Sequence, residues 1–414
     1  MRLSQLFTKT LRELPKDEKS INAQLLIRGG FIRKLMAGVY TFLPLGWQVH
    51  KKIEEIIREE MNKIGGQEIF MPTLNPRKAW EITNRWKYPE MFKLKSRQNK
   101  DYSLGWTHEE IVVPLAKEFL RTHRDLPFYV YQIQNKFRDE LRVKSGLLRG
   151  VEFMMKDLYS FHRDEKDLDN YYDKVKKAYF KIFKRCGLEK ITYLCLASGG
   201  TFSQYSHEFQ TITPFGEDEI YLCQKCKLAI NREIIKREKN KCSQCGNKNL
   251  VVKKSIEVGN IFKLMDRFSR PFDLAFINKE GRKKTVLMGC YGIGLGRLMG
   301  AIVETSNDEK GIIWPAEVSP YQIHLIQIEN NIKIKKFSEK LYQDLQKANI
   351  EVLYDDRNNK TAGEKFADAD LIGVPYRLVV SERTLIKNCI EIKKRNENRI
   401  KLAKIKSIIQ QVNS

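Results

Sequence analysis

The sequence lacks any apolar run long enough to cross a bilayer, which requires about 18 residues. No charged and then apolar segment opens the chain in the manner of a secretion signal. These two absences exclude a membrane-spanning protein and lead us to expect a cytoplasmic one with no membrane partner. No internal repeat or low-complexity tract is visible either, so the 414 residues should form two or three ordinary globular domains.

Acidic residues are scarce compared with basic ones. The chain has 51 Asp and Glu against 75 Lys and Arg, a formal net charge of +24 that is spread along the sequence. A polyanion is a natural partner for such a surface, because Lys and Arg release counterions from phosphates. A lysine-rich soluble surface without any such partner explains the charge equally well. Charge therefore permits nucleic acid binding without proving it.

Cysteine is also sparse, with eight residues in the chain, and a cytoplasmic protein rarely uses them as a disulfide framework. Four are isolated and read as small buried apolar residues: Cys186, Cys195, Cys290 and Cys389. The other four form two CxxC pairs with fifteen residues between them: Cys223, Cys226, Cys242 and Cys245. This spacing predicts a structural zinc site, because four thiolates leave no open coordination position. The alternative is a hairpin without metal.

Hydrophobic periodicity predicts two long amphipathic helices, over 47–64 and 167–186. Short runs typical of strands lie around them, at 129–137, 191–196, 219–223 and 284–290. Clustered strands predict an α+β domain over 1–317, built on an antiparallel sheet flanked by helices. From 318 to 414 strands and helices alternate regularly (322–328, 333–348, 351–355, 363–371 and 377–380), which predicts a small α/β domain.

Charged and aromatic residues gather on two neighbouring segments. Arg138 and Glu140 stand two residues apart, and Arg149, Phe153 and Asp157 follow at four-residue intervals on the expected returning strand. Alternate residues of a strand share a face, so these side chains should meet in one cleft. Guanidinium groups suit phosphates and an aromatic ring can stack on a base. The pattern outlines a nucleotide site, with a salt-bridged hairpin as the alternative.

A glycine-rich strand that runs into a helix, MGCYGIGLGRLMGAIVE, begins at residue 288. Gly292 and Gly294 leave room for close backbone approach, and Arg297 falls in the first turn of the helix. A cation at that position opposes the helix dipole unless an anion accompanies it, which favours a bound phosphate. A dinucleotide fingerprint fits poorly, because no βαβ unit follows.

Taken together, these segments resemble motifs 2 and 3 of the class II aminoacyl-tRNA synthetases, and QEIFMPTL resembles motif 1. The similarity is closest to the bacterial-type prolyl-tRNA synthetases and extends from residue 1 to about 405. It is carried by GGFIRKLMAGVYTFLPLG, THEE, YQIQNKFRDE, EFMMKDLYSFH, SHEF, MGCYGIG and YDDR…GEKFADADLIGVP. It implies a proline–tRNA ligase that uses ATP and Mg²⁺, acts on L-proline and tRNA(Pro), and forms a homodimer through motif 1.

The resemblance also implies roles for individual residues. Arg138 would hold the α-phosphate and the amino-acid carboxylate, and Arg149 and Arg297 would hold the γ-phosphate; Arg138 and Arg297 are the expected catalytic residues. The ATP site would comprise Arg138, Glu140, Arg149, Phe153, Gly292, Gly294 and Arg297. The proline site would comprise Thr107, Glu109, Arg138, Asp157, His207 and Cys290. The C-terminal domain would bind the anticodon through Asp355, Asp356, Arg357, Glu364 and Lys365.

One departure from the family is plain. Members usually carry a large editing domain between motifs 2 and 3 that hydrolyses alanyl-tRNA, but only about 80 residues separate SHEF from MGCYGIG. A small zinc-ribbon-like insertion, 219–256, stands in its place. We therefore expect no editing by this chain, with mischarged tRNA cleared by a separate protein or tolerated. A non-catalytic paralogue is disfavoured because the residues expected to clamp ATP are all present. A synthetase for threonine, glycine or serine is disfavoured because Thr107, Glu109 and Cys290 match the proline-specific motifs.

Overall fold

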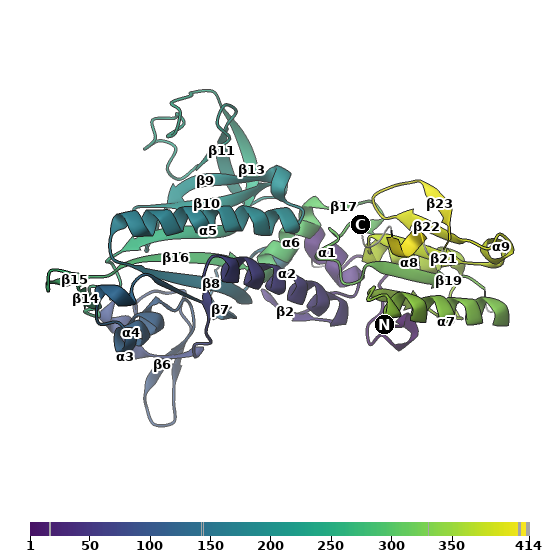
Figure 1. The fold of residues 1–414 in the computed structure, drawn as a ribbon, viewed down its shortest axis with the longest axis horizontal. Coiled ribbons are helices and arrows are strands. Elements are labelled where there is room, and N and C mark those ends of the chain that lie inside the picture. Colours follow the sequence, from purple (N-terminus) through teal and green to yellow (C-terminus); the bar gives the residue numbers. More distant parts are fainter. Residues whose placement is uncertain (16–17, 142, 144, 330, 405–406, 411–414) are drawn as a thin grey trace. The chain divides into compact units, whose positions relative to one another are not determined.

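The computed structural model describes residues 1–15, 18–141, 143, 145–329, 331–404 and 407–410 (Figure 1). The chain divides into two compact units by packing. The central unit holds residues 36–39 and 53–301, and the terminal unit holds 1–35, 40–52 and 302–414. The division at 317/318 and the 219–256 insertion, expected from the sequence, stay predictions.

The central unit is built on a nine-stranded sheet, counted over the described residues, in the order β10-β9-β12-β11-β13-β16-β8-β7-β3. Neighbouring strands run antiparallel except for the parallel pairs β12–β9 and β3–β7. The antiparallel architecture predicted from clustered strands is therefore confirmed. The strands are β3 (Gln67–Glu68), β7 (Phe128–Phe137), β8 (Glu152–His162), β9 (Thr192–Ser198), β10 (Tyr205–Ile212), β11 (Asp218–Cys223), β12 (Ala229–Asn231), β13 (Leu250–Met265) and β16 (Leu287–Gly294).

Helix α5 (Glu165–Arg185) packs against strands β8, β13 and β16 of this sheet. Its predicted apolar stripe is buried, and the side chain of Asp164 caps its first turn by accepting from the N–H of Asp167. The other long predicted helix is α2 (Pro44–Lys63), which begins three residues earlier than expected. It ends before Gly65, whose φ of 87° only glycine adopts readily.

The predicted strand 284–290 is wrong as a single element. The strand is interrupted at Val286, whose N–H donates to the carbonyl of Leu274. The first part, β15 (Lys283–Thr285), pairs with β14 (Ala275–Ile277) as a separate hairpin, and only β16 enters the large sheet. The apolar run Val286, Leu287 and Met288 continues across the break, so the sequence pattern gave no sign of it.

Shorter elements complete the first three quarters of the chain. They are α1 (Ile21–Arg28), β1 (Ile32–Met36), β2 (Val39–Phe42), β4 (Leu74–Pro76), α3 (Arg77–Ile82), β5 (Lys93–Lys95), β6 (Asp101–Leu104), α4 (Glu109–Phe119), α6 (Leu295–Thr305), β17 (Asn307–Asp308) and β18 (Gly311–Ile312). Single 3₁₀ turns lie at Leu3–Gln5, His123–Asp125, Gly146–Leu148 and Glu189–Ile191. Within the described residues, no helix is long and apolar enough to span a membrane.

The terminal unit contains a five-stranded sheet in the order β20-β19-β21-β22-β23. Strands β19 (Ile323–Gln327), β20 (Val352–Asp355) and β21 (Tyr376–Val380) are parallel. Helices α7 (Ile332–Lys347) and α8 (Ala362–Ile372) connect them, so the predicted α/β alternation is confirmed. Sequence reasoning missed the antiparallel extension formed by α9 (Glu382–Ile386), β22 (Ile390–Lys394) and β23 (Ile400–Ala403).

Candidate active site

Four of the residues predicted to bind ATP line one cavity of about 300 Å³ in the central unit: Arg138, Glu140, Arg149 and Arg297. Arg138 directly follows strand β7, and Arg297 lies in the first turn of α6, which continues from β16. Arg149 does not lie on the returning strand as expected, because it follows the 3₁₀ turn Gly146–Leu148 and precedes β8. The turn nevertheless brings its side chain to the same cavity.

The guanidinium of Arg138 lies over two aromatic rings, 5.3 Å from the centroid of Phe153 and 6.0 Å from that of Trp106. Its Nε has no hydrogen-bond partner among the described residues. Burial lowers the pKa of Arg138, and the positive charge of Arg297 lowers it further. A largely buried cation that forms no direct ion pair with any described residue is prepared for an anionic ligand.

The other two arginines are paired with carboxylates. Arg149 Nη2 lies 2.8 Å from Glu140 Oε2, and Arg297 Nη1 lies 3.0 Å from Glu257 Oε2. Glu257 is thus the anion that accompanies the cation at the start of helix α6. Sequence reasoning missed Glu257, because an acidic residue on a strand carries no local signal of what it faces.

Glu257 belongs to a group of carboxylates beside the cavity. Burial, and then the charge of Glu257, raise the pKa of Glu208 to about 8, and burial also raises the pKa of Asp218. Asp218 and Glu257 both line the cavity. Crowded carboxylates with raised pKa values are a suitable environment for a divalent cation with oxygen ligands.

Gly292, Gly294 and Phe153 do not line the cavity itself. A Cβ on Gly292 would lie 2.8 Å from Oδ1 of Asn260, so a larger residue there would displace that side chain of β13. A Cβ on Gly294 would meet only the Cβ of Arg297, at 3.6 Å. Phe153 is partly exposed, and its ring lies against the guanidinium of Arg138. Direct contacts of these three residues with ATP stay predictions.

Three of the predicted proline-binding residues meet in one buried cluster. Thr107 Oγ1 donates to Glu109 Oε2 over 2.6 Å, and Cys290 Sγ donates to Glu109 Oε1 over 3.2 Å. Glu109 is the first residue of helix α4 and is completely buried. Burial and the neighbouring charge of Glu109 hold the pKa of Cys290 well above its usual value, so the thiol keeps its proton and donates it.

Arg85 completes this cluster and was missed by sequence reasoning. Its Nη1 lies 3.3 Å from Glu109 Oε2 and 3.0 Å from Glu110 Oε1. Four aromatic rings surround its guanidinium, with centroids 4.8 to 5.6 Å away: Trp80, Trp106, Phe202 and Phe268. The only sequence signal was the concentration of Trp around position 85. Because Trp106 also lies under Arg138, it joins this cluster to the nucleotide cavity.

Asp157 and His207 do not contact the carboxylate of Glu109 directly. Asp157 accepts hydrogen bonds from Gln132, Tyr159 and Lys136, and Lys136 also bonds the ring of His108, which precedes Glu109. His207 bonds the hydroxyl of Tyr172 at 2.8 Å, and burial lowers the pKa of this imidazole to about 4. The expected contacts of Asp157 and His207 with proline stay predictions.

The chain matches the class II core domain of tRNA synthetases (G, H, P, S and T) over residues 92–306 and an anticodon-binding domain over 322–414. It is 34% identical to a proline–tRNA ligase of Dehalococcoides mccartyi BAV1 over 562 positions, which cover 100% of this chain and 98% of the relative. It is 38% identical to one of Wolbachia pipientis wMel over 422 positions, covering 99% of both. This chain belongs to the proline–tRNA ligase family.

Solved structures agree in fold with this ATP-dependent aminoacyl-tRNA ligase family. A prolyl-tRNA synthetase of Cryptosporidium parvum, crystallised with L-proline and AMP, has a TM-score of 0.78 at 19% identity, covering 95% of this chain and 74% of its own. The alignment with the Dehalococcoides ligase spans 562 positions against the 414 residues here, so a long stretch of that ligase has no counterpart in this chain. The Wolbachia ligase aligns over 422 positions and lacks such a stretch.

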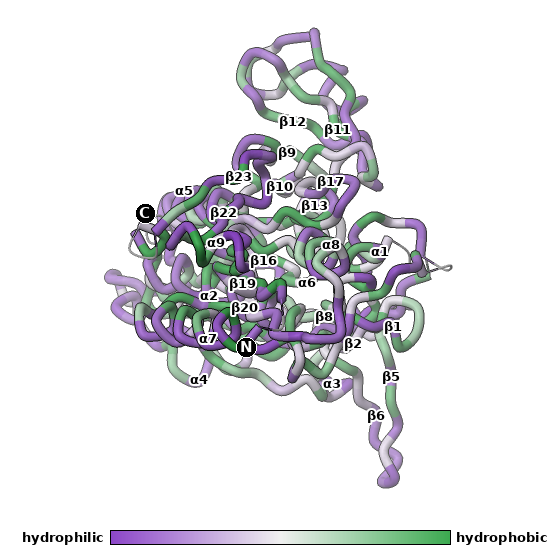
Figure 2. Tube along the Cα trace, turned by 90° about the vertical axis from the view of Figure 1, so that its right-hand side faces the viewer, coloured by the Kyte–Doolittle hydropathy of each residue, from purple (hydrophilic) through white to green (hydrophobic). Residues whose placement is uncertain are grey.

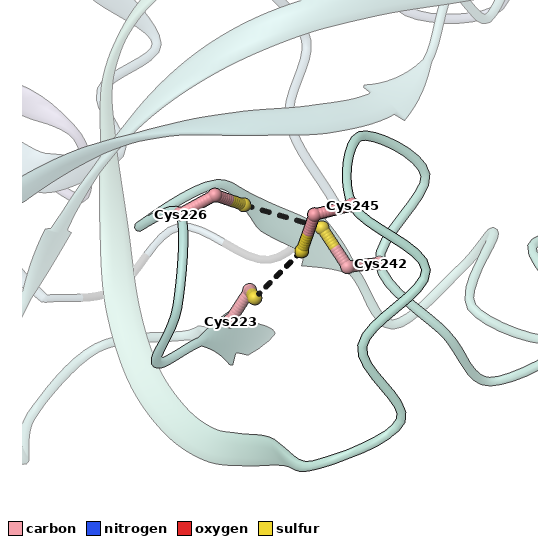
Figure 3. Close-up of side chains that lie close together, drawn as sticks. All are labelled: Cys223, Cys226, Cys242 and Cys245. Atoms are coloured by element: carbon pink, nitrogen blue, oxygen red, sulfur yellow. Dashed lines mark hydrogen bonds between the residues drawn. The ribbon is translucent and has the colours of Figure 1, made fainter.

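In this member of the family the four paired cysteines come together as the spacing predicted (Figure 3). Cys223 and Cys245 sulfurs lie 3.6 Å apart, and Cys226 and Cys242 sulfurs 3.4 Å. A tetrahedral zinc ion with Zn–S bonds of about 2.3 Å would hold its sulfurs about 3.8 Å apart. Backbone N–H groups, first that of Cys226, lower the pKa of Cys223 to about 6, whereas burial raises the pKa of Cys226 to about 12, so the meeting of the four sulfurs is what indicates a metal. The cluster therefore suits a metal that binds thiolates.

The residues predicted to bind the anticodon form hydrogen bonds and ion pairs with other residues of the terminal unit. Asp355 is fully buried and pairs with Arg357 at 2.7 Å, and the Lys365 ammonium donates to the carbonyl of Gln327 at 2.6 Å. Asp356 accepts from Ser4, and the Glu364 carboxylate accepts from the N–H of Thr361, the N-cap residue of helix α8. Asp356, Arg357 and Glu364 do line a cavity of about 790 Å³. Contacts of all five with RNA stay predictions.

Proposed function

We propose that this chain activates L-proline with ATP to form prolyl-adenylate and then transfers the prolyl group to the 3′ end of tRNA(Pro). One arrangement carries the proposal: an arginine-lined cavity joined through Trp106 to a buried carboxylate cluster. The cavity suits ATP phosphates, and the carboxylate of Glu109 suits the protonated ring nitrogen of proline, which has two protons to donate.

The chemistry follows from positioning and charge. The carboxylate of proline attacks the α-phosphorus in line and pyrophosphate departs. A ribose hydroxyl of the terminal adenosine then attacks the acyl carbonyl, loses its proton, and displaces AMP. Arg138 neutralises charge at the reacting phosphate. When ATP binds, Arg149 leaves its ion pair with Glu140, and Arg297 leaves its ion pair with Glu257, so that both arginines can bind the outer phosphates. Asp218 and Glu257 would hold Mg²⁺, which supplies further neutralisation of the phosphates. No side chain acts as a nucleophile.

Proline-dependent pyrophosphate exchange tests the proposal. Arg138→Ala should abolish exchange while the fold, followed by circular dichroism, stays intact. Arg163→Ala is a matched control, because that arginine is exposed directly after strand β8 and should leave exchange unchanged. Exchange that survives Arg138→Ala would overturn the assignment. Pyrophosphate exchange that depends on threonine, glycine or serine instead of proline would show that the enzyme activates that amino acid.

The chain also lacks the editing function of its longer relatives. This part of the proposal rests on the missing stretch relative to the Dehalococcoides ligase and on the short segment 219–256. Mischarged alanyl-tRNA(Pro) is then left to a separate protein or tolerated. The test supplies purified alanyl-tRNA(Pro) to this chain alone and follows free alanine. Rapid deacylation would refute the loss of editing.

Three further features belong to the same proposal. The cysteine cluster holds a structural Zn²⁺, the enzyme acts as a homodimer through its motif 1 region, and the terminal unit binds the anticodon of tRNA(Pro). A cytoplasmic location fits these substrates. Sedimentation analysis tests the dimer, and footprinting of tRNA(Pro) on the chain tests the anticodon contact. A monomeric active enzyme, or an unprotected anticodon, would refute the respective feature.

A further inference from the structure

Basic residues concentrate on the segment that carries the four cysteines, residues 222–254, which we call the ribbon. It contains ten Lys and Arg against two acidic residues, Glu233 and Glu238. All ten basic side chains are exposed: Lys225, Lys227, Arg232, Lys236, Arg237, Lys239, Lys241, Lys248, Lys253 and Lys254. Within the described residues only Arg232 forms an ion pair, 3.7 Å from Glu219. Cations without counter-charges are available to an external polyanion.

The ribbon begins at the wall of the nucleotide cavity. Strands β11 and β13 form its stem, with Asp218 opposite Ser255 at the base and Cys223 opposite Leu250 at the outer end. Asp218 and Ser255 line the ATP cavity. A second cavity of about 380 Å³ shares Glu217 and Asp218 with the first and is lined by Arg232 and Lys254 from the ribbon. Glu219 also lines this second cavity, so three carboxylates stand there beside two cations, and the excess of basic side chains begins beyond it on the ribbon.

The stem sets the distance that a ligand must span. From Asp218 to Cys223 the strand rises about 17 Å, at roughly 3.3 Å per residue. The ribbon projects from the sheet beyond β11 and β12 (Figures 1 and 2). ATP in the cavity lies at the base of the stem, whereas a nucleic acid strand with one end in the cavity can follow the stem to its outer end. The position of the charge thus selects an extended phosphate backbone.

The ribbon is a firm platform for these charges. Ile230, Ile234 and Ile235 form a small buried core with Leu196, Tyr221 and Leu250 partly buried around it. Both CxxC pairs close in the same way, because Lys227 and Gly246 follow them with positive φ and donate to the carbonyls of Cys223 and Cys242. A fixed platform loses less conformational entropy on binding than flexible lysine-rich loops do.

We propose that the ribbon binds the acceptor arm of tRNA and guides its 3′ end into the nucleotide cavity. This inference rests on the proposed function, because the terminal adenosine must reach the adenylate beside Arg138. The backbone phosphates of the acceptor arm then lie along the exposed cations of the ribbon. The segment that replaces the editing domain thereby gains a role in charging that does not depend on proofreading.

A four-residue variant tests the inference: Lys236→Gln, Arg237→Gln, Lys241→Gln and Lys248→Gln. None of these residues is a cysteine, and none lines either of the two cavities described above. We expect the KM for tRNA(Pro) in aminoacylation to rise at least tenfold. The logarithm of that KM should depend less steeply on the logarithm of salt concentration, because fewer counterions are displaced. Proline-dependent pyrophosphate exchange, which needs no tRNA, should not change.

The matched control removes the same charge from exposed positions on helix α5: Lys174→Gln, Lys177→Gln, Lys181→Gln and Lys184→Gln. An equal rise in KM in the control, or no rise in the ribbon variant, overturns the inference. A minihelix of the acceptor arm alone should show the same loss with the ribbon variant; a loss confined to full-length tRNA(Pro) also overturns it. Absence of exchange in the unmodified enzyme would instead refute the proposed function.

Discussion

The thiol of Cys290 donates a hydrogen bond to Oε1 of Glu109 across 181 positions of sequence. The second oxygen, Oε2, accepts from Thr107 and lies beside Arg85. Three donors therefore fix the carboxylate in one orientation before any substrate arrives. A carboxylate oriented in this way can accept a further, charge-assisted hydrogen bond, which is what a protonated ring nitrogen offers.

Replacing this carboxylate by its neutral isostere should weaken proline binding. Glu109→Gln keeps the shape and removes the charge, so a charge-assisted hydrogen bond worth about 1.5–3 kcal/mol is lost. We expect kcat/KM for proline to fall about 10- to 100-fold, with the KM for ATP nearly unchanged. Steady-state pyrophosphate exchange measures both. Glu118→Gln, exposed on the same helix, is the control, and an equal effect there would count against the role of Glu109.

Arg85 should be required for stability as well as for substrate binding. Arg85→Met fills a similar volume but leaves the buried carboxylates of Glu109 and Glu110 without their cation. An uncompensated buried charge costs about 3–5 kcal/mol in the free energy of unfolding. Urea denaturation followed by fluorescence should report the loss, because Trp80 and Trp106 flank the guanidinium.

Two variants make this result specific. Arg77→Met removes an exposed arginine that pairs with Glu81 and should have a much smaller effect. Adding Glu109→Gln to Arg85→Met removes one of the uncompensated charges and should restore part of the stability. A double variant no more stable than Arg85→Met would show that lost packing, not charge, explains the effect.

Glu110 should make stability depend on pH. Burial raises its pKa to about 7, above the value of about 4.3 for an unfolded chain. Between these values the folded state retains a proton that the unfolded state releases, so the free energy of unfolding falls as pH rises from about 4.3 to about 7. Glu110→Gln should reduce the difference in stability between pH 5 and pH 7.5, measured by urea denaturation. An unchanged difference would refute this titration. Glu208, whose pKa is raised to about 8, should also make the free energy of unfolding fall as pH rises.

The sequence predicted elements and motif residues better than the contacts between them. The stripe of α5 and the alternation around β19 to β21 followed from local periodicity, which burial on one face imposes. Arg85 and Glu257 escaped notice because their roles depend on partners far away in sequence, Glu109 and Arg297. Glu109 and Cys290 were found only because known motifs contain them. Long-range pairing leaves no periodic trace in a single sequence.

Local spacing can nevertheless reveal a site when its ligands come from short turns. Each CxxC pair supplies two thiols from one tight turn, so only the meeting of the two turns depended on the fold. That meeting is observed, with all four sulfurs within 4.8 Å of one another. The Gly-rich segment shows the opposite case. Its motif predicted a strand at β16, but nothing in the local sequence predicted the interruption between β15 and β16.

The cysteine cluster leads to the last prediction, a bound zinc ion that stabilises the ribbon. The enzyme purified without chelator should contain about one zinc per chain, and Cys242→Ser should lose it because three thiolates and a hydroxyl bind zinc more weakly. Cys389→Ser, an isolated cysteine in the terminal unit, should retain the metal. Elemental analysis gives the metal content, and hydrogen exchange gives the stability of 222–254, which should lose protection when zinc is removed.

Pyrophosphate exchange should be affected less than aminoacylation, because the thiols lie at the outer end of the stem and the ATP cavity at its base. Full protection of the ribbon in metal-free enzyme would show that its apolar core alone holds it together.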